Sequence, residues 1–402
     1  MQSADFTAKA QSYLGTLCSV RPNRRTGSPG NREATAFVAD VIGAFGYDVD
    51  ATPFDCLDHV SNGAELTRGG EAFEVCVSPY SLGCDVTAEL VAVATVEELE
   101  RADCAGKLLL LHGDICAEQL MPKNFVFYNP ESHQRIIALL EERQPAAIVT
   151  ATGRNPGMVG ALYPFPLIVD GDFDIANVHC RDTVGQTLAP LQGDTFRLAI
   201  DARRLPATGS NVIARLNPGA ARKIVLTAHL DAYDDSPGAL DDAAGVVVLM
   251  LCAEMLAGGA GPHGIEIVAI NGEDHYSAGG EMDYLARYGE SLPAVLLNVN
   301  VDDVGYREGA SVYSFYECSP ELEALAESVF ARFDGLARGE PWYMGDHMVF
   351  VQKGIPAIAL TAERMPELMR TVTHTAADTP DLVDAAKLVE VAEAIAALVR
   401  AL

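Results

Sequence analysis

The 402-residue chain has no run of about 18 apolar residues, the length that a helix needs to cross a membrane. The best candidate, residues 243–256, is shorter and contains Glu254, so it predicts a buried helix instead. The first residues also show no basic stretch followed by an apolar one, so we expect no signal peptide. The sequence therefore predicts a cytoplasmic protein without a membrane partner.

Paired cysteine motifs are missing as well. The nine cysteines are scattered singly, their number is odd, and no Cys-x-x-Cys occurs among them. A disulfide framework would require an even, clustered set in an oxidising compartment. We therefore expect free thiols.

Basic residues are scarce: 28 lysines and arginines face 56 aspartates and glutamates, which gives a formal charge of −28. Such a chain repels phosphate backbones and anionic lipid, so nucleic acid and membrane surfaces are not expected partners. Hydrophobic residues make up 49% of the chain, which is enough for a large packed core.

The pattern of apolar residues changes twice along the chain. Residues 30–46 predict an amphipathic helix with Asn31 as its N-cap, and residues 47–54 predict a strand. From residue 58 to 195 short strands dominate, with one helix at 132–143. We interpret residues 58–195 as a smaller, β-rich (α+β) inserted domain. Residues 1–57 and 196–402 then form one discontinuous domain.

The second half of that discontinuous domain alternates strands with helices. The expected strands are residues 211–216, 223–227, 264–270, 294–301, 311–316 and 357–360. The expected helices are residues 242–256 and 382–402. This alternation predicts an α/β fold with helices on both faces of the sheet.

Histidines and carboxylates fall where these strands end. His229 and Asp231 follow one strand, Glu273 and Asp274 follow the next, and Asp302 follows a third. Two more, Asp241 and His374, lie at a helix start and in a loop. In open α/β sheets the sites form beyond the carboxyl ends of the strands, so we expect these residues to meet. Taken singly, each has an ordinary explanation as a helix cap, a solvated turn or a hydrogen-bonded histidine.

Histidine together with carboxylate suits zinc, cobalt or manganese better than calcium or magnesium. Two such ions about 3.5–4 Å apart need a carboxylate between them. Two histidines and three carboxylates can give each ion three protein contacts if one carboxylate bridges. A further carboxylate that binds no ion can accept a proton from water and pass it to a leaving amine.

Several short motifs resemble the two-zinc exopeptidase family of bacterial leucyl aminopeptidase and glutamate carboxypeptidase. The resemblance covers roughly residues 10–55 and 205–402. Its motifs are residues 25–31 (RTGSPGN), 211–214 (NVIA), 228–231 (AHLD), 237–245 (PGALDDAAG), 271–274 (NGED), 300–305 (NVDDVG), 345–347 (GDH), 354–357 (GIPA) and 374–379 (HTAADT). All occur in order with suitable gaps. The resemblance implies a zinc-peptidase α/β/α sandwich with a mixed central sheet.

Matched motif by motif, the resemblance implies one zinc held by His229 and Asp302, and another held by His374 and Asp274. Asp241 would bridge the two. Glu273 would be the general base, and Asp231 would orient the imidazole of His229. The resemblance also implies a cis peptide between Asp241 and Asp242.

One position departs from the family pattern, in which glutamate is more common where this chain has Asp274. Two zinc ions per chain remain the prediction, and one tight and one weak or different divalent ion is the alternative. The insert resembles a protease-associated domain through residues 106–110 (GKLLL), 146–149 (AAIV) and 166–168 (PLI).

The resemblance implies a metallo-aminopeptidase acting on peptide substrates. A carboxypeptidase, a deacylase, a glutaminyl-cyclase-like enzyme or a binding relative stays open as an alternative. The segments beside the expected metals are acidic, which favours recognition of a free amine. A carboxypeptidase would call for an arginine, with Arg307, Arg364 and Arg370 as the candidates.

Overall fold

The computed structural model describes residues 2–125, 128–154, 157–259, 261–275 and 279–402. It divides the chain into two compact units: the flanking unit, Met1–Cys56 with Thr208–Leu402, and the inserted unit, Leu57–Ala207. The sequence-based boundary at residues 195/196 is twelve residues too early. Strand β9 (Thr195–Gly209) pairs with β5 (Cys84–Val93), so most of it belongs to the sheet of the inserted unit.

The flanking unit contains eight strands and eight helices among the described residues. Its strands are β1 (Asp48–Asp50), β10 (Val212–Leu216), β11 (Lys223–His229), β12 (Gly264–Ile270), β13 (Val295–Val301), β14 (Ser311–Tyr316), β15 (Leu336–Arg338) and β16 (Ala357–Ala362). Its helices are α1 (Gln2–Cys18), α2 (Pro29–Gly43), α6 (Gly245–Leu256), α7 (Gly280–Tyr288), α8 (Pro320–Phe330), α9 (His347–Val351), α10 (Met365–Thr371) and α11 (Ala385–Ala401).

The eight strands form one mixed sheet in the order β1-β10-β12-β11-β13-β16-β14-β15. The four central strands, β12, β11, β13 and β16, run parallel. The pairs β10–β12 and β14–β16 are antiparallel. The predicted mixed α/β sheet is therefore confirmed, and the carboxyl ends of the four central strands share one edge.

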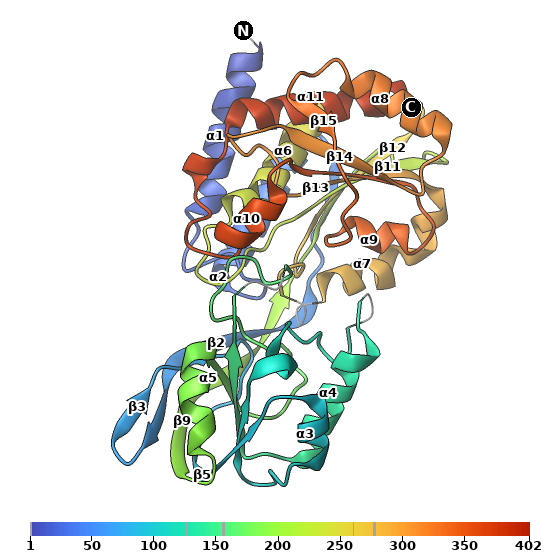
Figure 1. Cartoon of the computed structure of the whole chain (residues 1–402). Coiled ribbons are helices and arrows are strands. Elements are labelled where there is room, and N and C mark those ends of the chain that lie inside the picture. Colours follow the sequence, from blue (N-terminus) through green and yellow to red (C-terminus); the bar gives the residue numbers. More distant parts are fainter. Residues whose placement is uncertain (1, 126–127, 155–156, 260, 276–278) are drawn as a thin grey trace. The chain divides into compact units, whose positions relative to one another are not determined.

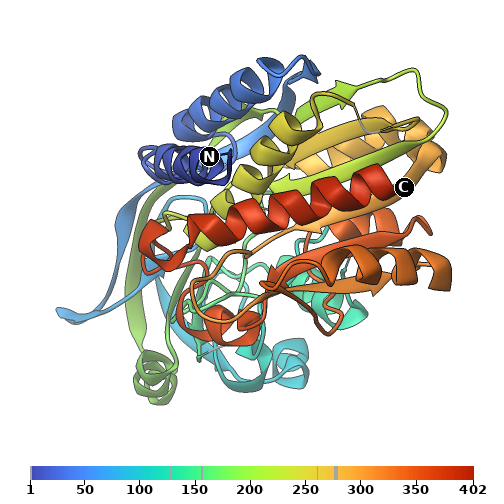
Figure 2. The same cartoon turned by 90° about the horizontal axis from the view of Figure 1, so that it is seen from above.

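Alternate residues of the central strands face opposite layers of helices. On β13, Leu297, Val299 and Val301 join the main apolar cluster with residues of α1, α2, α6, α8 and α11. Asn298 and Asn300 point to the other face, where each is bonded to Thr227 of β11. Figure 1 shows α7 and α9 on that face, and Figure 2 shows α11 beside α6 on the first. This is the predicted α/β/α sandwich.

Local corrections concern where elements begin. Ser28, not Asn31, caps α2, because its hydroxyl accepts a hydrogen bond from the amide of Asn31 at 3.0 Å. The side chain of Asn31 instead donates to Asn271 at 2.5 Å. Helix α6 begins at Gly245 rather than at residue 242, and the strand expected at residues 47–54 is limited to β1 before β2 begins.

The inserted unit has eight strands and three helices among its described residues. The strands are β2 (Phe54–Arg68), β3 (Glu71–Phe73), β4 (Cys76–Val77), β5, β6 (Leu108–Leu111), β7 (Ala147–Thr152), β8 (Asn177–Arg181) and β9. The helices are α3 (Val96–Arg101), α4 (Glu131–Arg143) and α5 (Asp182–Leu188). The sequence predicted α4 but missed α3 and α5, because six or seven residues are too few to show a helical period.

Strands β5, β6, β7 and β8 of the inserted unit are parallel neighbours. Leu109, Leu111 and Ile148 face one apolar cluster, whereas Leu108 and Leu110 face another, so both sides of the sheet are covered. This explains the run of four leucines, because a parallel strand covered on both faces carries apolar residues at every position. Within the part of the chain that the structure describes, no helix is both long and apolar enough to cross a bilayer.

Candidate metal centre

The predicted site residues lie around the edge of the sheet that the carboxyl ends of the central strands share. His229 is the last residue of β11, and Asp302 directly follows β13. Residues 271–275, which include Glu273 and Asp274, follow β12. His374 lies in the loop after α10, with a left-handed backbone (φ 65°). All of these elements belong to the flanking unit.

Asp241 lies between the two histidines. Its Oδ1 is 3.0 Å from Nε2 of His229, and its Oδ2 is 3.2 Å from Nε2 of His374. Each oxygen of one carboxylate thus faces a different imidazole. This is the arrangement that a carboxylate bridging two ions requires.

The other two carboxylates divide between the histidines. Oδ1 of Asp274 is 2.8 Å from Nε2 of His374, and Oδ1 of Asp302 is 3.8 Å from Nε2 of His229. The five residues therefore form two groups that share Asp241. These groups coincide with the two ligand sets implied by the resemblance, and ligation itself stays a prediction.

The structure adds Asp242 to this cluster. Ligand-capable atoms of His229, Asp242 and Asp302 lie within 4.8 Å of one another. Oδ1 of Asp242 accepts a hydrogen bond from the amide of Gly245 at 2.8 Å, and its Oδ2 is buried without a hydrogen-bond partner among the described residues. The sequence suggested only a helix cap for Asp242, since neighbouring aspartates at a helix start give no sign of which one turns inward.

Charge supports a cation at this cluster. Burial and neighbouring carboxylates raise the pKa values of Asp242 and Asp302. Burial by itself would lower the pKa of His374, but Asp274 and Asp241 outweigh it and raise that pKa well above its usual value. Buried carboxylates in excess of the protein's own cations are stable only with protons or metal ions. The donors are imidazoles and carboxylates, so the residues fit zinc.

Glu273 lies within the electrostatic reach of the same group. Its pKa is raised well above the usual value, first by burial and then by Asp274 and Asp302. Groups whose pKa is shifted by burial and by neighbouring charges are common among residues that transfer protons. This property is consistent with the predicted role of a general base.

Asp231 makes different contacts from those expected. Its Oδ1 is 3.7 Å from Nδ1 of His229, too far for a hydrogen bond. The same Oδ1 accepts from the amide of Gly272 at 2.8 Å, and its Oδ2 pairs with Nδ1 of His275 at 2.9 Å. Asp231 therefore anchors the segment that carries Glu273 and Asp274. The sequence left His275 ambiguous because only the folded chain shows the pairing.

Asp378 and Arg24 hold the loop that presents Asp241. The carboxylate of Asp378 accepts hydrogen bonds from the amides of Leu240 at 2.8 Å and Asp241 at 3.1 Å. The buried guanidinium of Arg24 donates to the carbonyls of Pro237 and Gly238, among others. The peptide between Asp241 and Asp242 is cis, as the resemblance implied.

Tyr233 packs against two histidines of the site. Its ring stacks on that of His374 with centroids 4.8 Å apart and on that of His275 at 6.0 Å. Nδ1 of His374 is buried and has no hydrogen-bond partner among the residues that the structure describes. Ring stacking therefore adds to the carboxylates at Nε2 in orienting this imidazole, and the sequence did not signal that contact.

Residues 211–399 match the model of Peptidase family M28. The match covers just under half of the chain, so it shows that this segment is similar to peptidase family M28. The matched segment contains every residue of the cluster described above.

Solved structures share this fold over nearly the whole chain. The aminopeptidase from Aneurinibacillus sp. strain AM-1 aligns with a TM-score of 0.76 and 22% identity, covering 98% of this chain and 93% of that one. BSAP, a zinc aminopeptidase from Bacillus subtilis, aligns with a TM-score of 0.74 and 20% identity, covering 98% and 94%. At these identities the likeness establishes a shared fold alone.

One relative by sequence is the probable lipoprotein aminopeptidase LpqL of Mycobacterium tuberculosis. It is 24% identical over 293 residues, which are 69% of this chain and 54% of the relative. This chain thus spans about half the length of that relative.

Proposed function

We propose that this chain is a metal-dependent aminopeptidase that removes N-terminal residues from peptides. The observation that carries the proposal is Asp241, whose two oxygens face His229 and His374 at 3.0 and 3.2 Å. The M28 match and the two aminopeptidases of like fold support the same reaction class.

His229, Asp302 and Asp241 would hold one zinc ion, and His374, Asp274 and Asp241 the other. Bound zinc would supply Lewis acidity, which polarises a carbonyl and lowers the pKa of water to about 7. One tight and one weak or different ion is the alternative, since Asp274 is shorter by a methylene than the glutamate common in the family.

Glu273 would take the proton of the attacking water and deliver it to the leaving amine. Its raised pKa suits both steps, because a group that accepts a proton must also release it near neutral pH. Asp231 would fix the position of Glu273 through its bonds to Gly272 and His275.

Recognition of a free amine is favoured over recognition of a free carboxylate. Arg364, one of the three candidate arginines, already pairs with Glu367 and Glu308. Arg307 donates to the carbonyl of Asp381. Acidic side chains beside the cluster, such as Asp346 and Glu281, would instead attract an ammonium group.

The test compares leucylglycine with its N-acetylated and C-amidated forms. Acetylation should block cleavage, and amidation should leave it intact. The reverse result would make the chain a carboxypeptidase, with Arg370 as the first candidate for binding the carboxylate. Release of ammonia from glutaminyl peptides without release of an amino acid would favour a glutaminyl-cyclase-like reaction.

The inserted unit is proposed to be a protease-associated-like domain. The segments that suggested it form β6 and β7 of its parallel strands. Deletion of the inserted unit would not by itself identify the role of this unit.

A further inference from the structure

The inserted unit contains a cavity of about 380 Å³. Its walls come from the residues that follow three parallel strands: His112 after β6, Arg154 after β7, and Asp182 after β8. Ligands of parallel sheets bind beyond the carboxyl ends of the strands. The volume also lies in the range of about 300–1,000 Å³ that small-molecule sites occupy.

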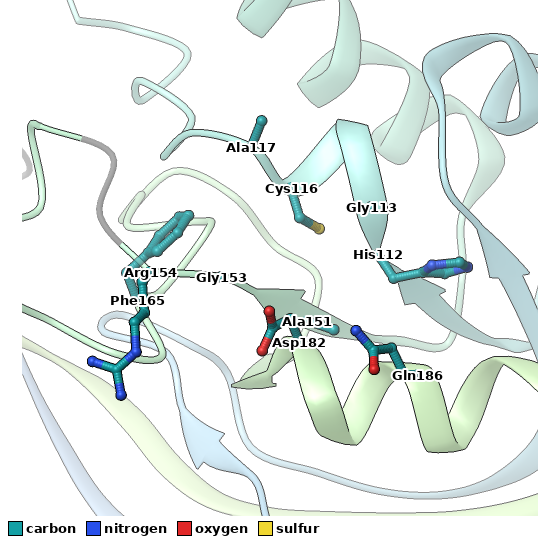
Figure 3. Close-up of a pocket in the computed structure, with 10 residues that line it drawn as sticks. All are labelled: His112, Gly113, Cys116, Ala117, Ala151, Gly153, Arg154, Phe165, Asp182 and Gln186. Carbon is teal, nitrogen blue, oxygen red and sulfur yellow. The ribbon is translucent and has the colours of Figure 1, made fainter.

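One side of the cavity is apolar and firmly packed. Cys116, Ala151 and Phe165 line it and are buried (Figure 3). Helix α5 lies directly against this wall, because a Cβ on Gly185 would come within 2.3 Å of the Cβ of Ala151. The wall therefore offers a fixed apolar surface to a ligand side chain.

The cavity is lined by two opposite charges, those of Asp182 and Arg154, which form no ion pair with each other within the described part of the chain. Tyr163 contacts both side chains. Its hydroxyl donates to Oδ1 of Asp182 at 2.8 Å, and the guanidinium of Arg154 lies 4.3 Å from its ring centroid. Oδ2 of Asp182 accepts no hydrogen bond from the described residues. The guanidinium of Arg154 likewise has no hydrogen bond or ion pair within the described part of the chain.

Two neutral polar side chains offer further hydrogen-bonding groups to a ligand. The amide of Gln186 lies one helical turn after Asp182 on α5, so the two share a face. The ring of His112 also lines the cavity. Neither side chain is engaged by another described residue, so both can bond a ligand.

We propose that this cavity binds a small zwitterion of the α-amino-acid type. The ligand carboxylate pairs with Arg154, and its ammonium group pairs with Oδ2 of Asp182 and the amide oxygen of Gln186. An apolar ligand side chain packs against Phe165 and Ala151. A simple anion would be repelled by Asp182 and a simple cation by Arg154, so a ligand carrying both charges fits best. The proposal does not depend on the peptidase activity.

The experiment is a calorimetric titration of the full chain, dialysed against chelator, with L-leucine, N-acetyl-L-leucine and L-leucinamide. Chelation suppresses amino-acid binding at the metal cluster. L-leucine should bind at least about tenfold more tightly than either derivative, because each derivative loses one charge-assisted contact. Absence of L-leucine binding up to about 10 mM, or equal binding of all three compounds, overturns the proposal.

Variants assign the binding to this cavity. Arg154→Gln and Asp182→Asn should each weaken L-leucine binding by about tenfold or more. Asparagine keeps an acceptor for Tyr163, so the wall should stay in place. Gln186→Ala changes an exposed side chain and should weaken binding about threefold even if the other two variants fold poorly. The matched controls Arg203→Gln and Glu142→Gln, both exposed in the same unit, should bind like the unaltered chain. Binding that is unchanged in all three cavity variants overturns the assignment.

Discussion

The phenol ring of Tyr233 lies nearly flat on the imidazole of His374, with centroids 4.8 Å apart and planes inclined by 18°. Many histidines that hold metals are oriented by a hydrogen bond from the second ring nitrogen. Here that nitrogen, Nδ1, is buried and finds no partner within the described part of the chain. Stacking on Tyr233 thus supplies a contact that orients the ring in place of that hydrogen bond.

Removal of this ring should weaken the metal position that includes His374. Tyr233→Leu should lower zinc affinity there by about 10–100-fold, as loss of an orienting partner typically does. Tyr233→Phe keeps the stacked ring and should stay within about threefold. Competition with a chromophoric chelator measures both, and equal affinities for the two variants would exclude a positioning role.

Loss of Asp241 should affect both metal positions together. Asp241→Ala is expected to remove most of the bound zinc, because its two oxygens face two different histidines. Elemental analysis after gel filtration measures the content. The control Asp334→Ala removes an exposed carboxylate and should keep the full content. A variant at Asp241 that retained all its metal would contradict the bridging role.

Glu273→Gln should separate metal binding from catalysis. The variant keeps the metal content and loses about 10²–10⁴-fold in turnover, the usual contribution of a proton-transfer group. Kinetics on leucylglycine together with elemental analysis test this. The exposed control Glu290→Gln should be fully active, and a loss below tenfold at Glu273 would remove it from the mechanism.

Gly245 allows the start of α6 to approach β13. A Cβ at this position would lie 2.3 Å from Oδ2 of Asp242 and 2.4 Å from the carbonyl oxygen of Val301. Gly245→Ala should therefore cost about 1–3 kcal/mol of unfolding free energy. Gly15→Ala, in α1 with open space around it, should instead stabilise by about 0.5–1 kcal/mol. Urea unfolding measures both changes, and equal signs would contradict the steric argument.

His179 on β8 should make the inserted unit sensitive to acid. Burial lowers the pKa of its imidazole to about 4, whereas the unfolded value is near 6.5. Between these two values the unfolded chain binds a proton that the folded chain does not. Stability should therefore fall as the pH drops from 6.5 towards 4, by up to about 1.4 kcal/mol per pH unit. Urea unfolding of His179→Val should show a shallower loss over this window, and an unchanged slope would refute the assignment.

Much of the fold could be predicted from local patterns. The bounds of β12 and β14 agree with the expected strands 264–270 and 311–316. Continuous apolar or β-branched runs flanked by turn residues identify such strands without tertiary information. The domain boundary at residues 195/196 and the start of α6 were misplaced because strand pairing and a helix start depend on partners far away in the sequence.

Most residues of the candidate metal cluster could be predicted from their places along the chain, although Asp242 could not. His229, Asp274 and Asp302 follow parallel strands, and strand order alone brings such positions to one edge. Only the tertiary structure decided how these side chains are held. Asp231 bonds Gly272 and His275 and lies farther from His229, and Tyr233 stacks on His374 in addition to the carboxylates of Asp241 and Asp274. The position of a residue along a strand is set by local conformation. The choice among hydrogen-bond and stacking partners depends instead on distances of a few ångströms between separate segments of the chain, and no local sequence pattern encodes these distances.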